Sequence, residues 1–212
     1  MIAPGIRILL VDDHAIVRAG FKRLLEQQPD FLVIAEASEA DRAYSLFVEH
    51  LPDVVVMDLS MPGVSGFDTI RRIIGREPAA RILVFSMHED AAVAERALAL
   101  GARGYVTKSN PPEVLAAAVA EVVAGKLALS PDIARAIALL KLAGEDSPVD
   151  LLSAREFEIF RLLSAGRPAA DIAKLLNLSA KTVANYHTLI KQKLKISTDV
   201  GLVLLAQRHC IV

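Results

Sequence analysis

The sequence contains no tryptophan, only seven phenylalanines and three tyrosines, and a single cysteine. Its cores must therefore be built mainly from the aliphatic residues that dominate the 53% of hydrophobic positions. The lone Cys210 excludes an intrachain disulfide and a metal site made of cysteines. Apolar runs are interrupted by charges well before the roughly 18 residues that a membrane span requires. We also find no signal-peptide pattern and expect a cytoplasmic protein without membrane contact.

Neither sign of charge dominates the whole chain, which has 24 basic and 25 acidic residues. Residues 151–212, however, hold nine Lys/Arg against four Asp/Glu, which leaves 15 basic and 21 acidic residues in 1–150. An acidic half joined to a basic half is typical of a metal-binding regulator fused to a nucleic-acid binder. The length of 212 residues fits two small domains.

The first half alternates short β-branched apolar runs with amphipathic helical patterns. Several of these runs, such as Val54–Val56, show no polar alternation, which indicates strands buried on both faces of a parallel sheet. We predict a five-stranded, doubly wound α/β domain over 1–124. Its strands are expected at Ile6–Val11, Leu32–Ala35, Val54–Met57, Ile82–Phe85 and Gly104–Val106, and its helices near 15–27, 39–50, 66–76, 90–100 and 112–124.

The second half shows only helical patterns. We assign 125–147 to a linker with one helix at 131–143 and a hinge at 144–148, because the hinge contains Gly144 and Pro148. A small all-α domain of four helices follows over 148–212. Its helices are expected at about 154–165, 168–176, 180–194 and 198–208, the first of them opened by a capping box, Ser153 to Glu156.

Charged side chains follow the strands of the predicted sheet. Asp12 and Asp13 follow the first strand and Asp58 follows the third, its neighbour in a doubly wound sheet, so three carboxylates converge and require a cation. Oxygen ligands favour Mg²⁺. Lys108 follows the fifth strand and Ser86 ends the fourth, where they can hold an incoming phosphoryl group. Taken singly, these residues are better explained as turn formers and solvated charges, but their shared edge favours phosphoryl transfer.

Three segments of this edge resemble the receiver domains of response regulators. They are residues 10–14 (LVDDH), residues 57–63 (MDLSMPG) with Gly66, and residues 101–108 (GARGYVTK), and the resemblance covers the first 124 residues. It implies a flavodoxin-like fold in which Asp58 is phosphorylated and Asp13 binds Mg²⁺. It further implies that Asp12 and the backbone carbonyl of Ser60 assist in binding the metal, and that Lys108 and Ser86 stabilise the phosphoryl group.

The same resemblance implies a switch pair, Ser86 and Tyr105. In that scheme the hydroxyl moves toward the phosphoryl oxygens and the aromatic ring fills the vacated space. Ordinary packing of Tyr105 at a strand end is the alternative. We interpret His14 as structural or as a neighbour of the site, and His88 as a surface loop residue.

The helical half resembles the LuxR-type DNA-binding domain. The matching residues are 151–156 (LLSARE), Gly166, 172–176 (IAKLL), 178–183 (LSAKTV) and 190–194 (IKQKL), and a receiver joined to this domain is the arrangement of the NarL/FixJ class. A short helix, a turn and a second helix with a polar, basic face fit major-groove recognition. The candidate DNA-binding residues are Lys181, Thr182, Asn185, Tyr186, His187, Thr188, Lys191 and Lys193.

Two departures from the family pattern weaken this prediction. Ala184 stands where the family usually has a lysine, and Ala170 lies in a segment that commonly carries another cation. The helical domain could therefore be a module that contacts only proteins. On the last helix Val200, Val203 and Leu204 are candidates for a dimer surface, and for any one of them a core position is an equal alternative.

Together these patterns predict a phosphorylation-activated transcriptional regulator that is not an enzyme. The expected partners are a sensor histidine kinase, double-stranded DNA with paired half-sites, a second copy of the chain after phosphorylation and, as a further candidate, RNA polymerase. The runner-up is a phosphate sink or regulator whose helical domain contacts another protein.

Overall fold

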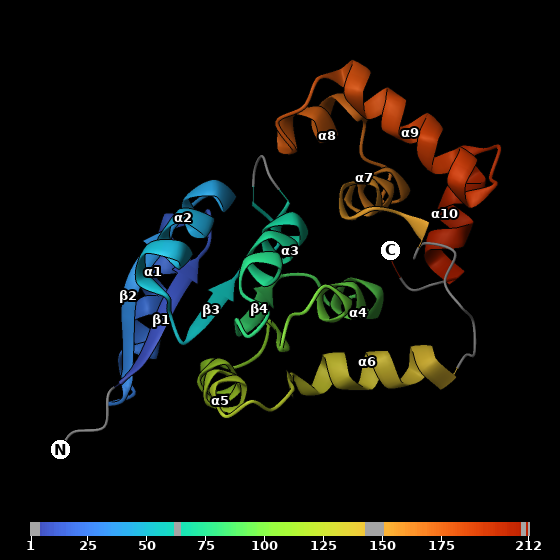
Figure 1. The fold of residues 1–212 in the computed structure, drawn as a ribbon. Coiled ribbons are helices and arrows are strands. Elements are labelled where there is room, and N and C mark those ends of the chain that lie inside the picture. The colour runs from blue at the N-terminus through green and yellow to red at the C-terminus, as the bar shows by residue number, and fades with distance from the viewer. Residues whose placement is uncertain (1–4, 62–64, 143–150, 209–210, 212) are drawn as a thin grey trace.

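The computed structural model describes residues 5–61, 65–142, 151–208 and 211 (Figure 1). Pro62 and Gly63 of the second motif, the predicted hinge at 144–148 and Cys210 lie outside the described residues. The strands are β1 (Ile6–Val11), β2 (Phe31–Ala37), β3 (Val54–Met57), β4 (Ile82–Ser86), β5 (Gly104–Thr107) and β6 (Ala128–Leu129). The helices are α1 (Ala15–Leu25), α2 (Ala40–His50), α3 (Gly66–Arg76), α4 (Ala91–Ala99), α5 (Pro112–Val123), α6 (Pro131–Leu142), α7 (Ala154–Ser164), α8 (Ala169–Leu175), α9 (Ala180–Leu194) and α10 (Asp199–Arg208).

The strands form one parallel sheet in the order β2-β1-β3-β4-β5-β6. Its central strands β3 and β4 are buried along their whole length, as expected for a sheet covered on both faces. One face packs against α1 and α5, and the other against α2, α3 and α4. The predicted doubly wound fold is therefore confirmed.

The sheet has six strands where the sequence predicted five. The added strand, β6, lies in the segment assigned to the linker and pairs with β5 through Gly104–Ala128 and Tyr105–Leu129. Two residues are too short a run to show a strand period in a sequence.

The helix that follows β6 packs on the receiver half. Helix α6 contacts α4 and β5, and it runs alongside α4 in Figure 1. At its start the Asp132 carboxylate accepts hydrogen bonds from Thr107 Oγ1 and from Asn110 Nδ2, both at 2.9 Å. This part of the predicted linker thus adds a strand and a helix to the receiver fold.

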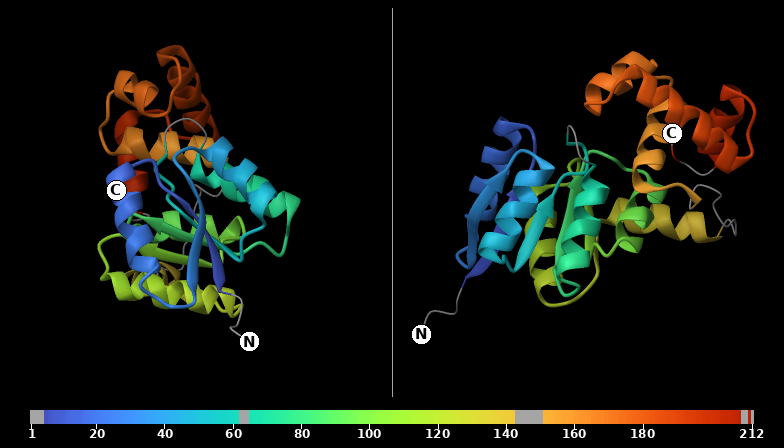
Figure 2. Two further views of the ribbon diagram at one scale, coloured as in Figure 1. Left: turned by 90° about the vertical axis from the view of Figure 1, so that its left-hand side faces the viewer. Right: turned by 45° about the horizontal axis from the view of Figure 1, so that its top comes forward.

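The last four helices form the second unit, grouped at one end of the molecule in Figure 2. The predicted capping box opens α7, because Ser153 Oγ accepts from the Glu156 N–H while the Glu156 carboxylate accepts from the Ser153 N–H. The core of the unit is apolar and includes Phe157, Phe160, Ile172, Val183, Ile190 and Leu194.

The two units meet through α7, which packs against α3. The rings of Phe67 on α3 and Phe157 on α7 lie edge to face with centroids 6.1 Å apart. The Arg96 guanidinium on α4 donates to the Leu152 carbonyl just before α7. Within the described residues, no helix combines the length and the apolar character needed to cross a bilayer.

Candidate functional site

The predicted acidic cluster lies at the carboxyl ends of β1 and β3. Val11 pairs with Met57 in the sheet, and the Asp58 N–H donates to the Val11 carbonyl at 2.9 Å. This register places Asp12 and Asp58 side by side, and each is only 2% exposed. Two neighbouring, buried carboxylates repel each other and require a positive charge nearby.

Lys108 supplies part of that charge. Its Nζ atom lies 2.5 Å from Asp12 Oδ2 and 2.6 Å from Asp58 Oδ2. Burial alone would lower the pKa of the Lys108 ammonium, but the two carboxylates outweigh it and raise the pKa above its ordinary value. The lysine is therefore charged at neutral pH and points at the carboxylate that the sequence predicts to be phosphorylated.

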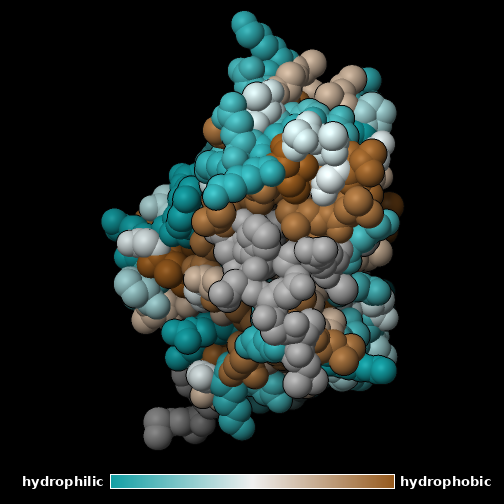
Figure 3. Space-filling model, turned by 90° about the vertical axis from the view of Figure 1, so that its right-hand side faces the viewer, coloured by the Kyte–Doolittle hydropathy of each residue, from teal (hydrophilic) through white to brown (hydrophobic). Residues whose placement is uncertain are grey.

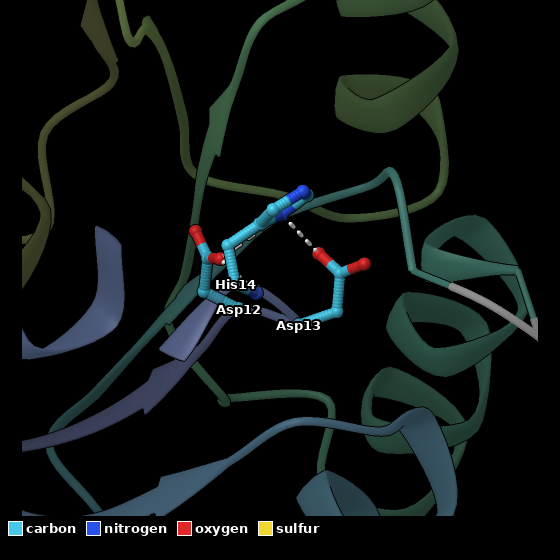
Figure 4. Close-up of side chains that lie close together, drawn as sticks. All are labelled: Asp12, Asp13 and His14. Atoms are coloured by element: carbon cyan, nitrogen blue, oxygen red, sulfur yellow. Dashed lines mark hydrogen bonds and ion pairs between the residues drawn. The ribbon is translucent and has the colours of Figure 1, made fainter. Parts of the chain in front are cut away.

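Asp13 and His14 lie next to Asp12 (Figure 4). We call the group formed by Asp12, Asp13, His14 and Asp58 the acidic corner. One ligand atom each from Asp12, Asp13 and His14 can be chosen so that all three lie within 4.8 Å of one another. The Oδ1 atom of Asp13 is buried with no hydrogen-bond partner among the described residues, although His14 Nδ1 lies 2.8 Å from it. Asp12, Asp13 and Asp58 against one Lys108 leave two uncompensated negative charges, which a divalent cation such as Mg²⁺ fits.

Ser60 and His88 connect this corner to the loop after β4. The Ser60 N–H donates to Asp58 Oδ1 at 3.0 Å, and Ser60 Oγ lies 2.9 Å from His88 Nε2. His88 is half-buried, so its interpretation as a plain surface residue was wrong. Burial, followed by the charges of Arg161 and Lys108, lowers the pKa of His88 to about 4. No pattern in the sequence indicated the contact between Ser60 and His88, because it joins two loops that meet only in the fold.

Ser86 and Tyr105, the predicted switch pair, are both fully buried. The Tyr105 hydroxyl donates to the His88 carbonyl at 2.9 Å, and the His88 N–H donates to Ser86 Oγ at 3.3 Å. Burial raises the pKa of the Tyr105 hydroxyl. The two residues thus lie on a continuous set of contacts that begins at Asp58.

Arg161 on α7 is a charge of the second unit that acts on this part of the receiver. Burial lowers the pKa of its guanidinium, while the nearby Asp90 and Glu158 oppose the shift. Its positive charge also acts to lower the pKa values of Tyr105 and His88. Nothing in the sequence singles out Arg161, because it falls on an ordinary amphipathic helix.

Helix α9 presents the predicted polar face to solvent. Lys181, Asn185 and Thr188 are exposed, and the Thr182 N–H donates to Ser179 Oγ at 3.0 Å, which caps the helix. Tyr186 is half-buried. The receiver half packs against α7 and leaves these residues of α9 exposed to solvent.

Three of the predicted DNA-binding residues have carboxylate partners inside the unit. Lys193 Nζ lies 2.7 Å from Glu156 Oε2, while Lys191 Nζ and His187 Nε2 lie 2.6 and 2.7 Å from Asp199 Oδ1. Glu156 and Asp199 come from α7 and α10, so sequence spacing along α9 could not reveal them. The two alanines that replace expected cations, Ala170 and Ala184, are both exposed.

We expect Lys193→Ala to lower the stability of the helical unit by about 1–2 kcal/mol, because it leaves a largely buried Glu156 carboxylate without its cation. Burial opposes ionisation of Glu156, but hydrogen bonds from Lys193 and Ser153 outweigh it and lower the pKa of this carboxyl below its ordinary value of 4.5. The stabilisation is therefore present above that pH and is lost as the pH falls through the folded-state pKa. Urea denaturation at neutral and acidic pH measures the difference in the free energy of unfolding between the parent chain and the variant. This difference should shrink at acidic pH; a difference of equal size at both pH values would contradict the pairing.

The last helix exposes part of its apolar surface. Val200 is 67% and Leu204 60% exposed, whereas Val203 is half-buried and Leu202 and Ala206 are buried. Figure 3 faces the side of the molecule on which α10 lies and shows apolar surface open to solvent there. Of the three residues proposed for a dimer surface, Val200 and Leu204 have the exposure that such a surface needs.

Comparison with known protein families gives two matches that together span most of the chain. The model described as the response regulator receiver domain matches residues 8–120, and the model described as bacterial regulatory proteins of the luxR family matches residues 150–206.

Two curated relatives and one of two solved structures match nearly the whole chain, and the other structure matches about two thirds of it. The transcriptional activator protein ExaE of Pseudomonas putida is 39% identical over 94% of each chain, and the response regulator UvrY of Escherichia coli K12 is 36% identical over 96% of this chain and 94% of its own. A LuxR-family response regulator from Aurantimonas is 49% identical over 65% of this chain and 99% of its own, with a TM-score of 0.64. The RcsB–DNA complex is 28% identical over 96% and 98%, with a TM-score of 0.62.

Proposed function

Because the chain belongs to the response regulators that join a receiver domain to a LuxR-type DNA-binding domain, and is thus a transcriptional regulator, we propose that Asp58 is its phosphorylation site. The observation that carries this proposal is the position of Lys108 Nζ, within 2.6 Å of the Asp58 carboxylate and 2.5 Å of Asp12. An ammonium held there can neutralise the oxygens of a phosphoryl group that arrives at Asp58.

The transfer is a displacement at phosphorus. An oxygen of the Asp58 carboxylate attacks the phosphorus of a phosphohistidine, the P–N bond breaks and the imidazole leaves with the electron pair, which yields an acyl phosphate on Asp58. Lys108 and the Ser86 hydroxyl would contact the phosphoryl oxygens. The phosphoryl group ends on the chain itself, so we regard the protein as a regulator and not as an enzyme.

Mg²⁺ fits the acidic corner by charge and by ligand type. Asp13, Asp58 and the Ser60 carbonyl would hold it, with Asp12 assisting. The ion would supply positive charge to the phosphoryl oxygens during transfer. This assignment is supported by three carboxylates against one Lys108 and by the buried Asp13 Oδ1 atom, which lies beside the His14 ring and accepts no hydrogen bond within the described residues.

A sensor histidine kinase is the proposed phosphoryl donor. An open hollow of about 760 Å³ lies beside Asp58 and Lys108 and is lined by apolar residues of α1, including Ile16, Val17 and Phe21. Ile16 is 89% exposed, which is unusual for an isoleucine of a folded protein. This surface supports docking of an apolar protein face next to the phosphorylation site.

DNA is the proposed target of the helical unit, contacted by the exposed face of α9. Phosphorylation would act on Ser86 and Tyr105 and, through His88 and the nearby charge of Arg161, on the contact that Phe157 makes with the receiver. Freed units would pair through α10 and bind two half-sites of duplex DNA as a homodimer. RNA polymerase is a further proposed partner. A regulator that binds DNA in this way would act in the cytoplasm.

Removal of Mg²⁺ tests the proposed site. With acetyl phosphate as donor, labelling of the chain should fall to background in the presence of EDTA and return with added Mg²⁺, because the metal offsets the charge of three carboxylates. Asp13→Asn should show the same loss at low Mg²⁺ although Asp58 is intact. Labelling that proceeds equally well without a divalent ion would overturn the assignment.

A further inference from the structure

A histidine and a lysine of α9 converge on one carboxylate oxygen of α10. His187 Nε2 lies 2.7 Å and Lys191 Nζ 2.6 Å from the same Oδ1 atom of Asp199. His187 and Lys191 are one helical turn apart and therefore share a face of α9. Their side chains are 27% and 24% exposed, whereas that of Asp199 is 70% exposed. The carboxylate is thus the most exposed of the three groups in this contact.

This arrangement is that of an anion-binding site. A lysine ammonium and an imidazole nitrogen directed at one oxygen are what a phosphate group meets on a protein. An open groove of about 410 Å³ beside them is lined by His187, Lys191, Thr188, Lys195 and Ser197, which adds two hydroxyl groups and a further cation. The anion that the structure shows on His187 and Lys191 belongs to the chain itself.

We propose that Asp199 is an internal stand-in for a phosphate of the DNA backbone, and that DNA displaces it from His187 and Lys191. The proposal rests on the DNA binding proposed above and names the site that one backbone phosphate occupies. Exposed ion pairs of this kind are weak, so the displacement lowers affinity by less than about tenfold. A lysine already neutralised by a carboxylate also releases few counterions when DNA arrives.

The position of Asp199 links this site to α10. Asp199 is the first residue of that helix, next to the exposed Val200. Displacement of its carboxylate therefore acts on the start of the helix proposed for pairing. The helix start itself is secured by Thr198, whose Oγ1 accepts from the Gly201 N–H at 3.0 Å, so a change at Asp199 does not remove the cap.

The test compares Asp199→Asn with Asp171→Asn. Asp171 is exposed on α8 and forms no ion pair within the described residues, so both variants remove one negative charge from the same unit. The full chain, phosphorylated with acetyl phosphate, is titrated against a mixed-sequence duplex of about 30 base pairs, long enough for two half-sites. The dissociation constant is measured as a function of NaCl concentration.

Asp199→Asn should bind about three- to tenfold more tightly at low salt, and its log–log salt slope should be steeper by about one, because Lys191 now releases a counterion to the phosphate. Asp171→Asn should leave the slope unchanged. In the double variant K191Q/D199N the gain should disappear. Equal effects of the two single variants, or unchanged binding by Asp199→Asn, would overturn the stand-in role. Absence of binding by every form at low salt would instead overturn DNA binding itself.

Discussion

Asp58→Asn should reduce phosphoryl transfer from acetyl phosphate to background. An amide nitrogen or oxygen is a far weaker nucleophile than the carboxylate that it replaces, and the change also removes one of the two anions that hold Lys108 at 2.6 Å. Asparagine has almost the same volume as aspartate, so the fully buried position should keep its packing. Phos-tag electrophoresis or mass spectrometry of the intact chain measures the product.

Asp41→Asn is the matched control. Asp41 is an exposed carboxylate on α2 that pairs with Arg72 on α3 at 2.6 Å, away from the acidic corner. This variant should be labelled like the parent chain. Undiminished labelling of Asp58→Asn, or equal loss in both variants, would end the assignment of Asp58.

The double variant Lys181→Ala/Asn185→Ala should weaken DNA binding by about 100-fold while phosphorylation is unchanged. Both side chains are exposed on the polar face of α9, where Asn185 can form two hydrogen bonds with an adenine and Lys181 can contact a phosphate. Neither contributes to the buried residues of the helix, which are Val183, Ile190 and Leu194, so the fold should persist. Fluorescence anisotropy with duplex DNA measures the affinity.

Lys126→Ala removes a comparable exposed cation from the receiver half and serves as the control. It should bind DNA within about twofold of the parent chain, since charges beyond a Debye length are screened. DNA binding that survives the double variant would move the contact surface away from α9. Loss of phosphorylation in the double variant would show that the change had disturbed more than one surface.

The receiver half was readily predicted because its candidate site residues directly follow strands that the apolar pattern identifies. Strand-end residues such as Asp12, Asp58 and Lys108 are placed together by the topology of a doubly wound sheet, and uninterrupted apolar runs identify its buried strands. The strand β6 was missed because it is two residues long and is defined by its pairing with β5. A pattern of that length carries no period to detect.

The basic face of α9 was predicted less completely. Lys191, Lys193 and His187 are spaced along the helix as candidate DNA contacts, but Glu156 and Asp199 reach them from other helices. Ion pairs of this kind depend on tertiary packing, which helical periodicity does not encode. The same limit explains why His88 was interpreted as a surface loop residue and why nothing singled out Arg161: each acquires its neighbours only when β4, β5 and α7 come together.

The central claim is that the state of Asp58 controls binding of DNA by α9. Selection of genomic DNA fragments by the full chain, with and without acetyl phosphate, measures this most directly. We predict that phosphorylation enriches a defined set of fragments with paired half-sites, and that Asp58→Asn recovers none of this enrichment. Recovery of the same fragments to the same extent by Asp58→Asn would contradict the account.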